Sequence, residues 1–76
     1  MQARIISLMT DALMGEEVNA DSTVDNLTGW DSLGHLSILS ALDEASGGNI
    51  NAISEFSDVK SVKEIVNLCN LHNLIF

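Results

Sequence analysis

The stretch Gly29-Trp30-Asp31-Ser32-Leu33 lies between a long polar segment and a segment in which apolar residues recur every three or four positions. At about 100° per residue, this spacing gathers the apolar residues on one side of a helix, with His35 beside them and Leu33 on the opposite side. We therefore predict a helix over residues 32–46, which ends at the pair of glycines that follows. Its apolar stripe comprises Ile38, Leu39, Leu42 and Ala45.

Helical periodicity is also present toward both ends of the chain. Residues 2–14 carry an apolar stripe and are followed by Gly15, which is a good stop signal for a helix. Ser61 resembles an N-cap, and Glu64 three residues later completes a capping box. We therefore predict a first helix over residues 2–14 and a last helix from residue 62 to about residue 70.

The segment between the first two predicted helices, residues 16–31, has no sustained period. It is rich in Asp, Asn, Ser, Thr and Gly, which favour turns and caps. A connection of this length is unusual in a compact domain and points to a functional loop. Three apolar residues within it are expected to hold the loop against the core: Val18, Val24 and Leu27.

The predicted architecture is all-α, a small four-helix bundle with three main helices, one short helix and a long loop after the first. The short helix is a single helical turn at residues 55–59. The apolar tail at residues 71–76 is expected to continue the last helix or to pack against the first. A chain of 76 residues has room for one core, so we expect a single domain over residues 1–76.

The chain is acidic, with a formal net charge of −8, and the charge is concentrated in its middle. Neither Lys nor Arg occurs between residues 16 and 58, whereas most of the Asp and Glu residues lie there. Three basic residues cannot build a surface that follows a phosphate backbone, so nucleic acid is not an expected partner. Basic protein surfaces are electrostatically complementary to this negative charge. Attraction between them mainly raises the rate at which two proteins encounter each other. The alternative is that acidity only keeps a small protein in solution.

Cys69 is the single cysteine, so an internal disulfide is impossible, and its place in an apolar pattern predicts a buried side chain. The first fifteen residues lack the apolar run of a signal peptide, and no segment is long enough to span a bilayer. Cytoplasmic location is the resulting expectation. The Asp-x-Asp-x-Asp-Gly spacing of a calcium loop is absent, and no metal site is predicted.

Ser32 stands at the start of the second predicted helix, where the first amide groups lack intrahelical partners. Taken by itself, this position predicts that Ser32 is the N-cap, because serine is a preferred cap. A phosphate ester on this serine would also be favoured there by the helix dipole. Asp31, Ser32 and His35 are the residue types of a hydrolase triad, but no strand or glycine-flanked turn leads into the serine. We therefore predict no catalytic residue.

Asp31-Ser32-Leu33, placed after a long acidic loop and before a leucine-rich helix, resembles the phosphopantetheine attachment motif of acyl carrier proteins. The resemblance covers nearly the whole chain. It includes the Leu42-Asp43-Glu44 end of the second helix, and residues 59–66 (VKSVKEIV) are similar to the family's short third helix leading into its fourth. The total length and the acidity are also similar to those of stand-alone carriers.

The resemblance implies that the protein is a non-catalytic carrier. A phosphopantetheinyl transferase would attach 4'-phosphopantetheine from coenzyme A to Ser32, and the arm would hold an acyl or aminoacyl group as a thioester. Asp31 and Leu33 would serve recognition around the attachment site, and Asp43 and Glu44 would make acidic contacts late in the helix. The implied partners are the transferase and the loading and processing enzymes with basic docking surfaces, and the implied state is a monomer.

Several residues depart from the family's common pattern. The serine follows Leu27-Thr28-Gly29-Trp30-Asp31, not a Leu-Gly-x-Asp sequence, and this is more similar to discrete carriers of specialised pathways. Gly34 and Ser37 stand where fatty-acid carriers usually have acidic residues, and Gly47-Gly48 replaces a more familiar Phe-Gly pair. Fatty acyl, aminoacyl, malonyl and polyketide cargoes all remain open. The alternative function is an unmodified helical interaction module that binds a basic partner through its acidic surface.

Overall fold

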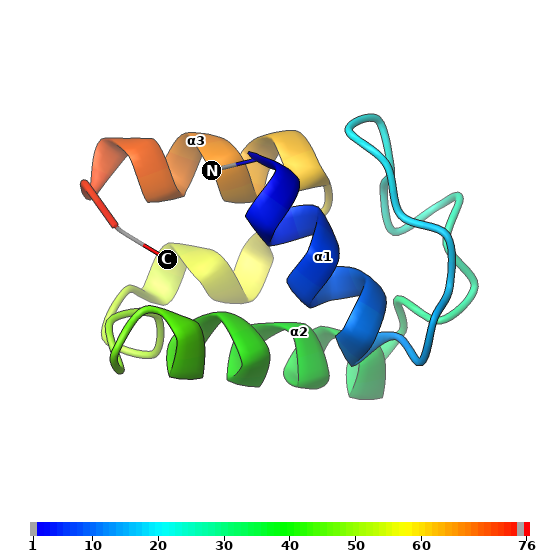
Figure 1. Cartoon of the computed structure of the whole chain (residues 1–76), viewed down its shortest axis with the longest axis horizontal. Coiled ribbons are helices and arrows are strands. Elements are labelled where there is room, and N and C mark those ends of the chain that lie inside the picture. Colours follow the sequence, from blue (N-terminus) through cyan, green and yellow to red (C-terminus); the bar gives the residue numbers. More distant parts are fainter. Residues whose placement is uncertain (1, 75) are drawn as a thin grey trace.

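The computed structural model describes residues 2–74 and residue 76. Within them the chain forms three α-helices and one short 3-10 helix, and no strand: α1 (Gln2–Ala12), α2 (Ser32–Ala45), η1 (Ser54–Asp58) and α3 (Val62–Leu71). The all-helical class is confirmed for the described part of the chain. Figure 1 shows α1 crossing obliquely between α2 and α3, with the long loop at one end of the molecule. Residues 1 and 75 of the predicted domain range lie outside the described residues.

The helices lie close to the predicted ranges. α1 ends at Ala12, two residues before the predicted end, and α2 ends at Ala45, one residue before. The helical turn predicted at residues 55–59 is the 3-10 helix η1, and α3 extends to Leu71. The periodic apolar residues therefore locate the helices well, while the exact ends are set by local capping.

One hydrophobic core connects the helices, because α1 packs against both α2 and α3, and η1 packs against α3. The predicted stripes supply much of it, and the loop contributes Val18 and Leu27 as buried residues and Val24 as a partly buried one. The fully or nearly fully buried apolar side chains are Ile5, Met9, Leu13, Val18, Leu27, Trp30, Ile38, Leu42, Ile50, Phe56, Val59, Val62, Ile65, Cys69 and Leu74.

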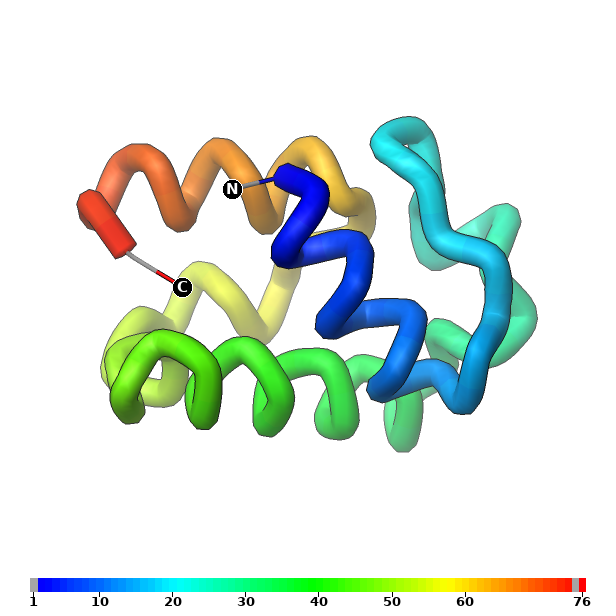
Figure 2. The backbone as a smooth tube through the Cα atoms, in the orientation of Figure 1, coloured from blue at the N-terminus to red at the C-terminus, as the bar shows by residue number. Residues whose placement is uncertain are grey.

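All three α-helices end in the same way, with two nested backbone hydrogen bonds around a left-handed residue. At the end of α2, the Gly48 amide donates to the Asp43 carbonyl over 2.7 Å and the Gly47 amide donates to the Glu44 carbonyl over 3.3 Å. Gly47 has φ 76°, which a residue without Cβ adopts at little cost. The unusual glycine pair therefore ends α2 and reverses the backbone there, as Figure 2 shows.

The long loop is joined to the η1–α3 connection by a short antiparallel contact. Thr23 and Ser61 form an isolated bridge, flanked by the hydrogen bonds from the Val24 amide to the Lys60 carbonyl and from the Val62 amide to the Ser22 carbonyl. These bonds span 2.9 and 3.0 Å. The loop is therefore attached to the rest of the fold at its middle, and its last residues are delivered to the start of α2.

The tail packs onto the core after α3 has ended. Leu74 is buried and Phe76 packs against the core cluster, whereas Leu71, in the last turn of α3, is exposed. The predicted continuation of the last helix into residues 71–76 holds for Leu71 alone, while Leu74 and Phe76 pack against the core cluster, and Ile75 falls outside the described residues. The apolar tail therefore contributes to the core instead of forming a separate surface.

Candidate functional site

The N-cap of α2 is Asp31, so the prediction that Ser32 is the cap is wrong by one residue. The Asp31 side chain accepts a hydrogen bond from the Gly34 amide over 2.8 Å, and its carbonyl accepts one from the His35 amide. Ser32 is the first helical residue and its side chain is exposed. Among the described residues, its hydroxyl makes no hydrogen bond. Aspartate and serine are both good caps, and the choice of Asp31 leaves the serine hydroxyl free.

Two exposed leucines follow Ser32 on the surface of α2. The side chain of Leu33 is 76% exposed, as its place on the helical wheel predicts, and that of Leu36 is 62% exposed. A single exposed leucine is ordinary, but these two stand one and four residues after Ser32. The free hydroxyl of Ser32 therefore lies beside two solvent-facing apolar side chains.

The loop that leads into Ser32 is held by Glu16, a residue to which the sequence pattern assigned no role. The Glu16 carboxylate accepts a hydrogen bond from the Gly29 amide over 2.8 Å and is 3.5 Å from the Thr28 hydroxyl. In addition, Gly34 lies so close to the loop that a Cβ built on it would overlap the Gly29 carbonyl oxygen. The start of α2 and the end of the loop therefore touch backbone to backbone.

Trp30 packs the end of the loop onto the core next to the candidate site. Its side chain is 4% exposed, and its indole N–H donates to His35 Nδ1 over 2.9 Å. The two rings are stacked, with centroids 6.2 Å apart and an interplanar angle of 15°. The sequence predicts a partly buried His35 with a local hydrogen bond, and the structure confirms both features.

The Trp30 contact also determines which nitrogen of His35 carries a proton. Indole N–H is a donor only, so Nδ1 must be the unprotonated acceptor, and the proton of the neutral ring is on Nε2. His35 Nε2 is buried and has no hydrogen-bond partner among the described residues. A buried donor without a partner costs about 1–3 kcal/mol, so this atom is the one poorly satisfied group of the site.

A groove of about 530 Å³ opens beside Ser32, between the start of α2 and the η1–α3 connection. Its walls are largely apolar, and Lys60 supplies the one basic side chain among its lining residues. The residues that line it are Val24, Trp30, Asp31, Ser32, His35, Leu36, Ser57, Asp58, Val59 and Lys60. The candidate attachment residue and the unsatisfied histidine thus border the same hollow.

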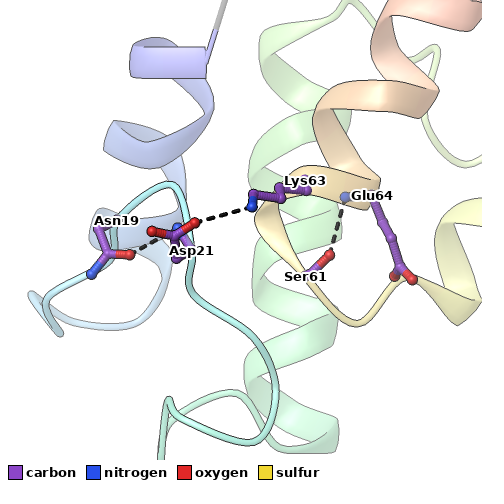
Figure 3. A network of polar contacts seen from close by, with 5 residues as sticks. All are labelled: Asn19, Asp21, Ser61, Lys63 and Glu64. Atoms are coloured by element: carbon purple, nitrogen blue, oxygen red, sulfur yellow. Dashed lines mark hydrogen bonds and ion pairs between the residues drawn. The ribbon is translucent and has the colours of Figure 1, made fainter.

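The side of the groove formed by the η1–α3 connection is braced by the polar network in Figure 3. Ser61 caps α3, because its hydroxyl accepts from the Glu64 amide over 3.1 Å, as the predicted capping box requires. The Glu64 carboxylate, however, accepts from the Lys60 amide and not from that of Ser61. Lys63 pairs with Asp21 of the long loop over 3.1 Å, but both side chains are largely exposed, so the pair adds little stability.

The structure does not bring Asp43 and Glu44 near Ser32. They lie eleven and twelve residues along α2, which places them about 16–18 Å away along the helix axis. The Asp43 carboxylate accepts from the amides of Ile50 and Asn51, each over 3.0 Å, and thereby fixes the turn after α2. Glu44 is exposed. Of the two residues predicted to make acidic contacts late in the helix, Asp43 therefore has an internal role as well.

Other chemistry in the described residues is limited. Asp31 and His35 are hydrogen-bonded to Gly34 and Trp30 respectively, so they do not form the Asp–His pair of a hydrolase triad. Burial raises the pKa of the Cys69 thiol to about 11 and confirms its predicted place in the core. Within residues 2–74 and 76, no three His, Cys, Asp or Glu side chains gather where they could hold a metal ion.

None of the helices among the described residues combines the length and the apolarity needed to cross a membrane. A scan against models of known protein families gave no match for this chain, and searches of curated proteins and of solved structures gave none either.

Proposed function

We propose that the protein is an acyl carrier protein that takes a 4'-phosphopantetheine group from coenzyme A on Ser32. The observation that carries this proposal is an exposed serine hydroxyl at the first position of α2, left free because Asp31 caps the helix. The resemblance of Asp31-Ser32-Leu33 to the attachment motif of this family gives that hydroxyl a chemical role. In this proposal the fold is a four-helix bundle in which η1 is the short helix.

The surroundings of Ser32 suit a phosphate ester. The first turn of α2 has backbone amides without intrahelical partners and carries the positive end of the helix dipole. The Asp31 carboxylate opposes an added phosphate, but it is occupied by the Gly34 amide. Lys60 lines the neighbouring groove and is the one basic side chain of that lining. These residues of the chain would hold the group at the mouth of the groove.

Attachment requires one transfer, in which the Ser32 hydroxyl oxygen forms a bond to the phosphorus that bears the pantetheine. The bond from that phosphorus to adenosine 3',5'-bisphosphate breaks, and the transferase accepts the hydroxyl proton. When bound, the group supplies a terminal thiol that holds an acyl or aminoacyl cargo as a thioester. The protein itself performs no catalysis, and tethering gives each partner enzyme a high effective concentration of cargo.

Partner enzymes would meet α2 at two places. Near Ser32, Asp31 is charged and Leu33 and Leu36 offer apolar contact, and at the far end Glu44 is a solvent-facing carboxylate. Basic docking surfaces on the transferase and on the loading and processing enzymes would complement this acidic protein. We propose that it acts as a monomer in the cytoplasm. The residues before and after Ser32 favour a specialised biosynthetic pathway over general fatty-acid synthesis.

Incubation with coenzyme A and a broad-specificity phosphopantetheinyl transferase tests the proposal. We expect the intact mass to rise by one phosphopantetheine group, and we expect Ser32→Ala to abolish the gain. Ser37→Ala is the matched control, because Ser37 is another exposed serine of the same helix. No gain with several transferases would contradict the carrier function and favour the unmodified interaction module.

The new thiol gives an independent readout of the same reaction. Cys69 is fully buried and its pKa is raised to about 11, so it should react slowly with a thiol reagent at neutral pH. We therefore expect no fast-reacting thiol before the transferase reaction and one equivalent after it. Unfolding in denaturant then exposes Cys69 and provides the internal standard.

Leu33→Ala is expected to slow modification by the transferase about tenfold, while the melting temperature changes by no more than about 2 °C. The reason is that Leu33 is 76% exposed, so little buried area is lost on truncation. Modification rates and thermal unfolding, measured on the same sample, check both parts. A melting temperature lowered by more than about 10 °C would instead assign Leu33 to the core.

A further inference from the structure

Two adjacent residues are suited to cap the start of α2, and the choice between them decides whether the Ser32 hydroxyl is free. Aspartate and serine are nearly equivalent N-caps, so the side chains of Asp31 and Ser32 do not by themselves decide where the helix begins. In the structure Asp31 has extended backbone angles, φ −95° and ψ −165°, and Ser32 is the first helical residue. The start of α2 therefore depends on contacts from outside this helix.

Such a contact runs from Glu16, shortly after α1, through Gly29 to the first turn of α2. The Glu16 carboxylate accepts a hydrogen bond from the Gly29 amide over 2.8 Å, and the Gly29 carbonyl oxygen lies directly against the backbone of Gly34. Neither glycine has room for a side chain, because a Cβ on Gly29 would overlap Glu16 Oε1 and a Cβ on Gly34 would overlap the Gly29 carbonyl oxygen. Gly29 is therefore clamped between the Glu16 carboxylate and α2.

We infer that Glu16 is a positioning residue for the transfer to Ser32. By holding Gly29, it makes Asp31 the cap of α2 and leaves the serine hydroxyl free. This inference rests on the proposed function. Gly29 is two residues before Asp31, so a fixed Gly29 keeps the Asp31 carboxylate at the Gly34 amide, from which it accepts a hydrogen bond over 2.8 Å. Without the Glu16 carboxylate the loop end is released, the first residue of α2 frays, and Ser32 takes over as the cap.

The position of the cap matters for the transfer because the Ser32 hydroxyl oxygen is the atom that forms the bond to phosphorus. As a cap, this oxygen accepts a hydrogen bond from a backbone amide of the first helical turn and is turned toward the helix. Leu33, on the exposed face of α2, remains available to the transferase in either case. A change of cap therefore removes the reacting group without removing the surface that the transferase binds, so it lowers kcat and leaves KM nearly unchanged.

Steady-state kinetics of the transferase, with coenzyme A and the unmodified protein as substrates, test this inference. We expect Glu16→Ala to lower kcat roughly tenfold to a hundredfold, because a displacement of about 1 Å can cost a reaction that much. A merely structural role gives the opposite pattern, since unfolded molecules only reduce the concentration of usable substrate. They raise the apparent KM and leave kcat unchanged. Circular dichroism at the assay temperature measures the folded fraction.

Two further variants separate the hydrogen bond of Glu16 from its charge. Glu16→Gln removes the charge but keeps a side-chain oxygen that accepts from the Gly29 amide. Glu17→Ala removes one negative charge from the next residue, whose side chain is exposed. We expect both variants to retain a kcat close to that of the unaltered protein, so that only the loss of the acceptor at residue 16 slows the transfer.

Nuclear magnetic resonance measures the position of the cap without the transferase. Carbon-13 chemical shifts of the backbone distinguish an extended cap residue from a helical one. In Glu16→Ala, we expect the shifts of Ser32 to move from helical toward extended values, and the Gly29 amide to exchange faster with solvent. In Glu16→Gln, we expect Ser32 to remain helical.

The possible outcomes are distinguishable. If the unaltered protein accepts no phosphopantetheine, the proposed function fails and the positioning role of Glu16 fails with it. If the unaltered protein is modified and Glu16→Ala retains its kcat or keeps Ser32 helical, the inference is overturned while the proposed function stands. An equal loss of kcat in Glu16→Gln or Glu17→Ala would assign the effect to charge, and a raised KM alone would assign it to folding. Either result would also overturn the inference.

Discussion

Gly34→Ala is expected to lower the free energy of unfolding by about 3 kcal/mol, near the upper end of the range for overpacked sites. A methyl group at this position would overlap the Gly29 carbonyl oxygen and would stand 3.0 Å from Leu13 Cδ2. The obstructing atom belongs to the backbone, so it moves only if the loop leaves the start of α2. For a domain of this size, the loss corresponds to a melting temperature lowered by roughly 10–20 °C.

Helix propensity alone predicts the opposite result, which makes the variant informative. Alanine is favoured over glycine inside a helix by about 1 kcal/mol. At a site with room for the methyl group, the substitution would therefore stabilise the protein. Ser37→Ala is the control, because it places the same residue at an exposed position of the same helix. Urea unfolding of the two variants measures their free energies of unfolding and distinguishes the two expectations. Equal or greater stability in Gly34→Ala would contradict the close contact with Gly29.

The contact also explains one of the departures from the acyl carrier pattern. Gly34 occupies a position where fatty-acid carriers usually have an acidic residue, and in this fold no side chain of any charge fits there. Ser37, the second such position, is exposed and leaves room for a larger group. The two departures therefore have different causes. The first is dictated by packing against the loop, whereas the second changes only the exposed surface of α2.

The sequence predicts the helices well because each has a regular apolar stripe. The stripes of α1, α2 and α3 bury the residues that periodicity selects, such as Ile5, Ile38 and Ile65. The capping of α2 was predicted one residue too late, because aspartate and serine are nearly equivalent caps and adjacent in the chain. That single residue matters for the proposed function, since it decides whether the Ser32 hydroxyl is bonded or free.

Contacts between distant segments are the part that sequence patterns did not predict. The hydrogen bond between Glu16 and the Gly29 amide joins positions thirteen residues apart in an irregular loop. Apolar residues do not recur regularly there, so the sequence pattern gives no indication of the contact. The resemblance to acyl carrier proteins implies a partner contact for Asp43, but its carboxylate accepts hydrogen bonds from two amides of the following turn. The hydrogen bond from Trp30 to His35 Nδ1 and the burial of Nε2 without a partner depend on how the loop packs against α2, which no periodic pattern encodes.

Trp30→Ala is expected to lower the free energy of unfolding by about 3–5 kcal/mol, the range for truncation of a buried aromatic residue. Trp30 is 4% exposed and belongs to the core cluster, so its removal leaves a cavity between the loop and α2. Small domains are typically stable by about 5–15 kcal/mol, so the variant should be close to unfolding. Leu71→Ala is the control, because Leu71 is 71% exposed and should cost less than about 0.5 kcal/mol.

Far-UV circular dichroism must follow this unfolding, since the variant lacks the single tryptophan of the chain. Trp30→Phe then separates ring packing from the hydrogen bond, because it keeps an aromatic ring and leaves His35 Nδ1 without its donor. We expect it to cost about 1–3 kcal/mol, the penalty of a buried acceptor without a partner. A loss below about 1 kcal/mol for Trp30→Ala would show that the loop is held elsewhere.

The double variant Trp30→Phe with His35→Phe completes the thermodynamic cycle. Removing both partners leaves neither an unpaired donor nor an unpaired acceptor, and such replacements can be nearly neutral. We therefore expect the double variant to be more stable than the sum of the two single losses predicts, by about 1–2 kcal/mol. Additive losses would mean that Trp30 and His35 stabilise the fold independently. In that case the Trp30 hydrogen bond would not be what holds the His35 ring against the groove.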